Sequence, residues 1–147
     1  MIQRIQSVYL FISTVLIGLL FLLPFAEIAK DGAIYLFNFK GILLDGVVKE
    51  TGWVVSCLII IVIALQVLAI FSFKNRKQQN KIILFAILML LGLLAAFVFF
   101  TYISFSGAQI NFKTGAVLPL IAIIVDYLAI RAIDKDEALI RSIDRIR

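Results

Sequence analysis

The chain has 147 residues, 63% of them hydrophobic, and its mean hydropathy of +1.12 exceeds what a soluble core of this size requires. Charged residues make up only 16% of the chain and cluster between long uncharged stretches, a pattern typical of membrane spans joined by polar connections. The net charge of +5 does not indicate nucleic-acid binding, because the basic residues flank apolar runs without a basic, aromatic-lined groove. The absence of histidine and the single cysteine argue against zinc, haem and iron–sulfur sites, so we expect no metal and no cofactor.

The first apolar run, residues 5–25, follows Arg4 and contains no charged residue. As a helix it would be about 30 Å long, which matches the thickness of the hydrocarbon core of a bilayer. The run is longer than the hydrophobic region of a typical signal peptide, and residues 24–26 make a poor cleavage site. We therefore expect a retained transmembrane helix.

The connection that follows, residues 26–50, has the features of a short β-structure. Two Asp-Gly pairs, at 31–32 and 45–46, are signals for tight turns. The stretch after the first pair is rich in strand-forming residues and places three aromatic side chains on one face at a period of two, namely Tyr35, Phe37 and Phe39. We expect a strand or hairpin over the membrane surface, whose aromatic face is either an interfacial belt, the interpretation that we favour, or a docking surface for a partner.

Two further spans, residues 51–73 and 82–103, flank the most basic stretch of the chain. The first of these two spans contains Gln66 as its one strongly polar interior residue, and the connection 74–81 carries four positive charges and no acid. If the lysines and arginines are assigned to the two sides of the membrane, ten lie on the side of this connection and four on the other. Both termini and this connection are therefore predicted to be cytoplasmic, and the aromatic connection is predicted to face outward.

The next connection, residues 104–113, is short and polar, and its second half alternates like a strand. Its Asn-Phe-Lys sequence at 111–113 repeats the one at 38–40. The repeat is either a coincidence or a sign of two strands that pair.

The last span, residues 114–132, holds the only acid inside an apolar run, Asp126. This acid lies about 7–8 Å below the cytoplasmic end of the span, at nearly the depth of Tyr9, with Gln66 somewhat deeper, so we expect these two side chains as its neighbours. A buried carboxylate must be paired, hydrated or protonated. We favour a structural hydrogen-bonding role, and proton or cation coupling and local access to cytoplasmic water are the alternatives.

Residues 134–147 form a charged tail in which acids come first and arginines last, an order that suits the dipole of a helix. Asp134 and Glu137 resemble a capping box, which predicts that a new helix begins here. An apolar stripe at helical spacing accompanies three arginines that are candidates for contact with lipid or a partner: Arg141, Arg145 and Arg147. Such a helix either lies on the inner leaflet or packs against a partner.

These patterns predict an all-α membrane protein with two parts. Residues 1–133 would form a four-helix transmembrane bundle with a short extracytoplasmic strand or hairpin, and residues 134–147 an amphipathic cytoplasmic helix. The sequence contains no activated nucleophile, paired carboxylates or glycine-rich phosphate loop, so we expect no enzymatic activity and no catalytic residue.

The two ends of the chain also carry a resemblance to a known family. The chain begins MIQRIQSVYL over residues 1–10, and its last span begins GAVLPLIA over residues 115–122, ahead of the closing segment 136–147. In these motifs the chain resembles an uncharacterised family of small bacterial four-span inner-membrane proteins, known only as a domain of unknown function. The resemblance implies a bacterial inner-membrane location and the same four spans, and it brings no activity, ligand or site residue.

The leading functional hypothesis is a non-enzymatic accessory or assembly subunit. It would work through its outward aromatic connection and its cytoplasmic helix, with the lipid bilayer and either a membrane protein or further copies of itself as partners. A second hypothesis is a small proton- or cation-coupled transporter that uses Asp126, and a third is a protein that binds lipid or a small hydrophobic molecule. The first hypothesis predicts that Asp126→Asn is tolerated, and the second predicts that it abolishes flux.

Overall fold

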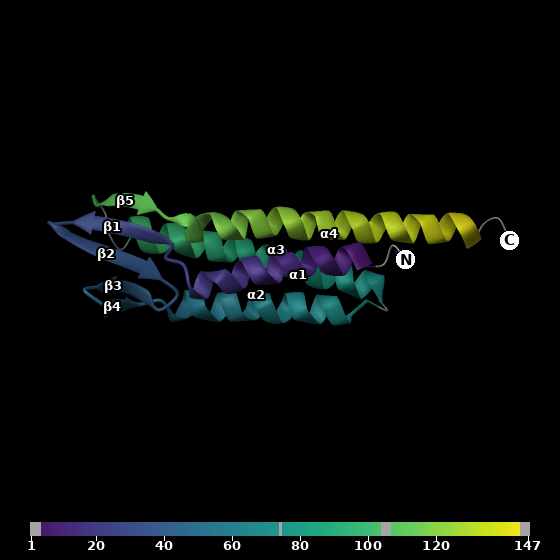
Figure 1. The fold of residues 1–147 in the computed structure, drawn as a ribbon, viewed down its shortest axis with the longest axis horizontal. Helices are drawn as coiled ribbons and strands as arrows, with labels where there is room; N and C mark the ends of the chain where they lie inside the picture. The colour runs from purple at the N-terminus through teal and green to yellow at the C-terminus, as the bar shows by residue number, and fades with distance from the viewer. Residues whose placement is uncertain (1–3, 74, 104–106, 145–147) are drawn as a thin grey trace.

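The computed structural model describes residues 4–73, 75–103 and 107–144. Within these ranges, four long helices run side by side along the long axis of the molecule, and a five-stranded sheet lies at one end of them (Figure 1). The start of the first helix and the end of the last lie at the opposite end from the sheet (Figure 1). The chain therefore has a helical body with one β-structured end.

The helices follow the long uncharged runs, and glycine and proline are rare within these helices: they occur at Gly18, which ends the first helix, and at Gly92, Gly115 and Pro119. Asn75 caps the third helix, because its side chain accepts a hydrogen bond from the backbone N–H of Gln78 at 3.3 Å. Pro119 lies in the second turn of the last helix, so the helix lacks the hydrogen bond that an N–H at this position would donate to the backbone oxygen of Gly115. The elements are α1 (Arg4–Gly18) with the 3₁₀ turn η1 (Leu19–Phe21), α2 (Trp53–Phe71), α3 (Arg76–Val98) with the π-helical turn η2 (Phe99–Ile103), and α4 (Thr114–Asp144).

The sheet is antiparallel throughout, with the strand order β4-β3-β2-β1-β5. The first four strands form a meander between α1 and α2, and β5 joins from the connection between α3 and α4. Both Asp-Gly pairs form two-residue turns in which each residue has a positive φ, the geometry that matches the twist of a hairpin. The strands are β1 (Ala26–Lys30), β2 (Ala33–Asn38), β3 (Gly41–Leu44), β4 (Val47–Thr51) and β5 (Gln109–Phe112).

The sheet makes the predicted all-α class wrong, because the chain has an α+β fold rather than that of an all-α four-helix bundle. A strand or hairpin within residues 26–50 and a strand-like segment in the second half of residues 104–113 were expected where five strands pair. The reason is that three strands give weak local signals: β1 and β4 each have two charged residues among five, and β3 has only four residues. Strands this short are stabilised by pairing with distant partners, which a local pattern does not contain.

Aromatic packing attaches the sheet to the ends of the helices. Phe37 on β2 is fully buried and meets the ring of Phe25 edge-on at 5.2 Å between centroids. Phe25 in turn stacks on Phe97 near the end of α3 at 4.4 Å. Burying a phenylalanine side chain contributes about 2–3 kcal/mol, so this cluster holds the sheet firmly against the helical body.

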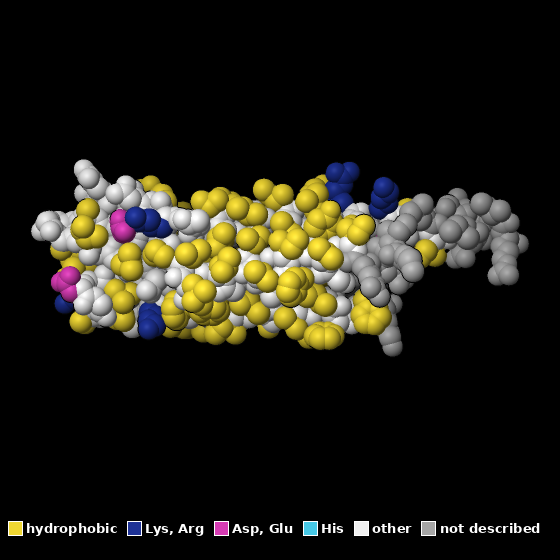
Figure 2. All heavy atoms as spheres, viewed as in Figure 1, with side chains coloured by type: hydrophobic (Ala, Val, Ile, Leu, Met, Phe, Trp, Pro, Cys, Tyr) yellow, Lys and Arg dark blue, Asp and Glu magenta, His cyan; other side chains and the backbone are white. Residues whose placement is uncertain are grey.

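Three helices in the described residues are long and apolar enough to cross a membrane, and these are α2, α3 with η2, and α4 as far as Ala138. The apolar stretch Ile5–Phe21 is shorter, because the chain leaves the first helix before Pro24 and Phe25 donates its N–H to Phe37 in the sheet at 2.8 Å. Figure 2 shows an uncharged, largely hydrophobic band across the middle of the visible face, with charged side chains towards its two ends. These features are consistent with a membrane protein.

The last helix runs from Thr114 to Asp144 without interruption. The break predicted between residues 133 and 134 is absent, and Asp134 lies inside the helix rather than at the start of a new one. Residues 134–144 therefore extend the same helix beyond the apolar part of the chain (Figure 1).

Candidate functional site

A buried polar cluster joins three helices around Asp126 on α4. The amide nitrogen of Gln66 on α2 donates to Asp126 Oδ2 at 3.1 Å and to Ser13 Oγ on α1 at 2.6 Å. Ser13 in turn donates to the backbone oxygen of Ala122 at 3.5 Å. All three polar side chains are at most 1% exposed. The structure thus brings Gln66 to Asp126, as their depths in the membrane led us to expect.

Small residues on α4 make this close arrangement possible. Ala122 and Ala129 lie one turn before and one turn after Asp126 on the same face, and both are fully buried. Their short side chains let α1 approach α4 closely, so that Ser13 reaches the α4 backbone. The acid therefore points into the protein, away from the exposed side of α4.

Two oxygen atoms in the cluster have no hydrogen-bond partner in the described part of the chain, namely Asp126 Oδ1 and Gln66 Oε1. Ser13 and Gln66, the side chains that bond within the cluster, are neutral. A carboxyl group in such surroundings can link helices through one oxygen while the other is able to accept a further donor. Among the described residues, no group of three His, Cys, Asp or Glu side chains could hold a metal ion.

Tyr9, the other predicted neighbour of Asp126, lies elsewhere. It lines an open pocket between α1 and α4, nearer to the end of the helices opposite the sheet. Depth alone placed Tyr9 beside the acid, but depth does not specify the face of a helix, and Ser13 occupies the face that meets Gln66.

A second layer of polar contacts, which the sequence analysis missed, lies nearer to the same end of the helices. Gln6 on α1 donates to Asp136 on α4 at 2.6 Å, and both side chains are less than 10% exposed. Asn80 on α3 donates to Asp134 on α4, also at 2.6 Å. The available signal was the spacing of Gln6 and Ser13, which places both on the buried face of the first helix.

The predicted aromatic surface faces inward. Phe37 is fully buried, and Tyr35 and Phe39 are half-buried and pack against the hydrophobic core. Phe39 also contacts Phe21 edge-on at 5.3 Å between ring centroids. The alternation of aromatic residues therefore indicated the face of the sheet that the helices cover. Of the tail arginines, Arg145 and Arg147 and the side chain of Arg141 lie outside the described residues.

The opposite side of the sheet carries an apolar patch, which we call the outer patch. Strand alternation and register place its members on the face turned away from Phe37. Ile34 is 66% exposed and Val48 is 40% exposed. These values are high for apolar side chains of the sheet, which lies beyond the ends of the apolar helices. The outer patch consists of Ala29, Ile34, Leu36, Leu43 and Val48, which neighbour one another across the cross-strand pairs 29 with 34, 36 with 43, and 43 with 48.

Comparison with known proteins places the chain in a family without an assigned function. The model of a family described as a domain of unknown function (DUF4293) matches residues 2–146, nearly the whole chain. This match confirms the resemblance to an uncharacterised family that the two ends of the sequence indicated. No curated protein and no solved structure matches the chain.

Proposed function

We propose that this chain, which belongs to the DUF4293 family, is a non-enzymatic accessory or assembly subunit of the bacterial inner membrane that binds a partner protein through its outer patch. The observation that carries the proposal is the exposure of Ile34 and Val48 on a sheet face that no other part of the described chain covers. Contiguous apolar surface on a part of a protein that meets water is a mark of a protein–protein contact site. The outer patch is small, so it fits a docking contact that is one part of a larger interface.

The distribution of charge supports an outward-facing sheet. Basic residues gather at the end of the helices away from the sheet, on the first turns of α3 and along the last turns of α4. Lysine and arginine are enriched on the cytoplasmic side of membrane proteins. In this orientation the sheet and its outer patch lie in the extracytoplasmic space, where a partner's outer domain would meet them.

Neighbouring residues on β4 provide a matched test. Val48 belongs to the outer patch, whereas Val47 points to the opposite face of the same strand and is 62% exposed. We would purify the full chain from its native membrane in mild detergent, with Val48→Glu and Ile34→Glu as patch variants and Val47→Glu as the control. A stoichiometric protein partner is expected with the wild type and the control, and its loss is expected with both patch variants.

Two results would contradict the proposal. One is a partner that both patch variants retain at the wild-type ratio, because the outer patch would then not be the contact surface. The other is a wild-type chain that purifies without any stoichiometric protein. Size-exclusion elution volumes and helical circular dichroism of the variants establish that each is folded before its partner content is compared.

The second candidate function is proton or cation coupling, and the observation that favours it is the fully buried Asp126 with one oxygen unpartnered among the described residues. A carboxyl group inside the membrane is a common part of a transport pathway. Against this candidate, the partners of Asp126 are neutral, and no further acid lies in the apolar spans predicted from the sequence, residues 5–25, 51–73, 82–103 and 114–132. Loss of proton or cation flux in Asp126→Asn liposomes, with the fold intact, would favour coupling over the accessory role.

A further inference from the structure

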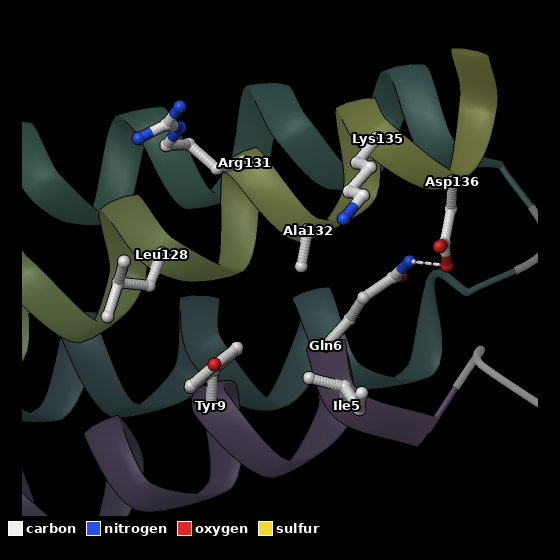
Figure 3. A pocket seen from close by; sticks show the side chains of 8 residues that line it. All are labelled: Ile5, Gln6, Tyr9, Leu128, Arg131, Ala132, Lys135 and Asp136. Carbon is white, nitrogen blue, oxygen red and sulfur yellow. Dashed lines mark hydrogen bonds between the residues drawn. The ribbon is translucent and has the colours of Figure 1, made fainter. Parts of the chain in front are cut away.

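The pocket between α1 and α4 combines apolar walls with two basic residues. It has a volume of about 650 Å³, within the range of sites that hold small ligands. Ile5 and Tyr9 on α1 face Leu128 and Ala132 on α4 across it (Figure 3). Lys135 also lines the pocket, and Figure 3 shows its ammonium group pointing into the space between the two helices. Arg131 lies at the rim with its guanidinium group turned outward (Figure 3).

The charges of the pocket favour an anionic ligand. Neither Arg131 nor Lys135 forms an ion pair with a carboxylate among the described residues, and both are exposed. The acid in the lining, Asp136, is only 8% exposed, and its Oδ2 accepts the hydrogen bond from Gln6 at 2.6 Å (Figure 3). The carboxylate of Asp136 is thus bonded at the contact between α1 and α4, whereas Arg131 and Lys135 are available to bind a ligand.

The position of the pocket along α4 corresponds to lipid headgroups. Lys135 is 21 residues after Thr114, the first residue of the helix, which places it about 30 Å along the axis. That distance equals the thickness of the hydrocarbon core, so the ammonium group lies at its far boundary. Lipid phosphates occupy this level of a bilayer.

An apolar track continues from the pocket towards the middle of the membrane. Ile12 follows Tyr9 by one turn on the same face of α1 and is 42% exposed. Ile124 and Ile121 precede Leu128 on α4 by one and two turns, and they are 59% and 41% exposed. An acyl chain lying against this track would place its headgroup at Lys135.

We propose that this pocket binds the phosphate of an anionic phospholipid, with Lys135 as the main contact, Arg131 as a second cation at the rim, and the acyl chain along the α1–α4 track. The site is independent of the outer patch, which lies at the other end of the molecule.

Native mass spectrometry of the full chain in mild detergent tests the proposal, with phosphatidylglycerol, phosphatidylcholine and inorganic phosphate as separate ligands. We expect one phosphatidylglycerol to bind per chain in preference to phosphatidylcholine. Lys135→Gln should weaken its apparent affinity by about fivefold, the effect of one basic residue at an anionic membrane surface. Lys77→Gln is the matched control, because Lys77 is an exposed cation at the same end of the helices, on α3 and outside the pocket.

Asp136→Asn provides a variant whose expected effect is a gain. It removes the negative charge in the lining and keeps an acceptor for Gln6, so phosphatidylglycerol should bind more tightly, a result that misfolding does not produce. Equal binding of the two lipids, or equal effects of Lys135→Gln and Lys77→Gln, would overturn the proposal. Inorganic phosphate that binds alone as tightly as phosphatidylglycerol would also overturn it, because the ligand would then be free phosphate rather than a lipid.

Discussion

Replacing Gln66 by leucine, which has a similar volume, removes both donor bonds through which α2 holds α1 and α4. The bond to Ser13 joins two neutral groups inside the membrane, a kind worth about 0.6 kcal/mol. The bond to Asp126 ends on a carboxyl group, and a hydrogen bond to a charged group is worth about 1.5–3 kcal/mol. The substitution also removes the unpartnered Gln66 Oε1, which offsets about 1 kcal/mol of the loss. We therefore expect Gln66→Leu to lower the free energy of unfolding by about 1–3 kcal/mol.

The partner substitution Asp126→Asn is expected to behave differently. It keeps an oxygen that accepts from Gln66, removes a formal charge that no cation in the described residues pairs with, and adds a donor to a cluster where Gln66 Oε1 lacks one. We expect no loss of stability from it. We also expect Gln66→Leu to cost less in the Asp126→Asn background than in the wild type, because a neutral amide is less costly to leave unpaired.

Unfolding with sodium dodecyl sulfate in mild-detergent micelles, followed by far-ultraviolet circular dichroism, measures all four proteins of this double-mutant cycle. Effects that add to within about 0.5 kcal/mol would refute the reasoning, because groups joined by a direct hydrogen bond should not behave independently. A stability loss in Asp126→Asn greater than that in Gln66→Leu would also refute it, since the carboxylate would then have an essential partner of its own.

Three further predictions concern packing and surface charge. Gly115→Ala should lower the stability of the protein by about 1–3 kcal/mol, because the added Cβ would lie 2.5 Å from a backbone oxygen of the segment before β1. Gly92→Ala should not lower it, because a Cβ added there would have no atom within 4 Å. Thermal unfolding in detergent compares the two variants. Phe37→Ala should cost about 3–5 kcal/mol and shift thermal unfolding far more than either glycine variant, because the ring is fully buried between sheet and helices. Glu27→Gln should cost less than about 1 kcal/mol, and the difference from wild type should vanish in 1 M salt, because the ion pair with Lys113 at 2.9 Å is partly exposed.

The sequence predicted the helical body well and the sheet poorly, for a physical reason. Long uncharged runs determine where a chain can cross a bilayer, and α2, α3 and α4 follow from that composition alone. The sheet depends instead on pairings such as Ala26 with Phe112, which lie far apart in the chain, so the alternation seen in residues 109–113 did not reveal which strand this segment pairs with. The aromatic alternation of β2 was visible, but period two does not distinguish a face covered by helices from one open to a partner.

Some residues of the candidate site were likewise predictable from the sequence, and others were not. Asp126 was identifiable because an acid in an apolar run is rare, and Gln66 because it is the polar residue of its own run at a similar depth. Ser13 was missed, because a serine causes no visible break in hydrophobicity and its role depends on which face of α1 meets α4. The pocket at Lys135 follows from the uninterrupted course of α4, which the expected break after residue 133 would have changed.

The sheet combines strands from two separate parts of the chain, and this affects the order in which it can form during synthesis. A ribosome delivers β1 to β4 soon after α1, but the partner of β1 on its other edge, β5, arrives only after α2 and α3, since the paired Ala29 and Gln109 are 80 positions apart in the chain. During that interval the N–H and C=O groups along this edge of β1 lack their final partners, which makes the edge a site for pairing with another chain. We therefore expect the sheet to close last and together with the insertion of α4, so that a nascent chain stalled before that helix remains open to strand exchange.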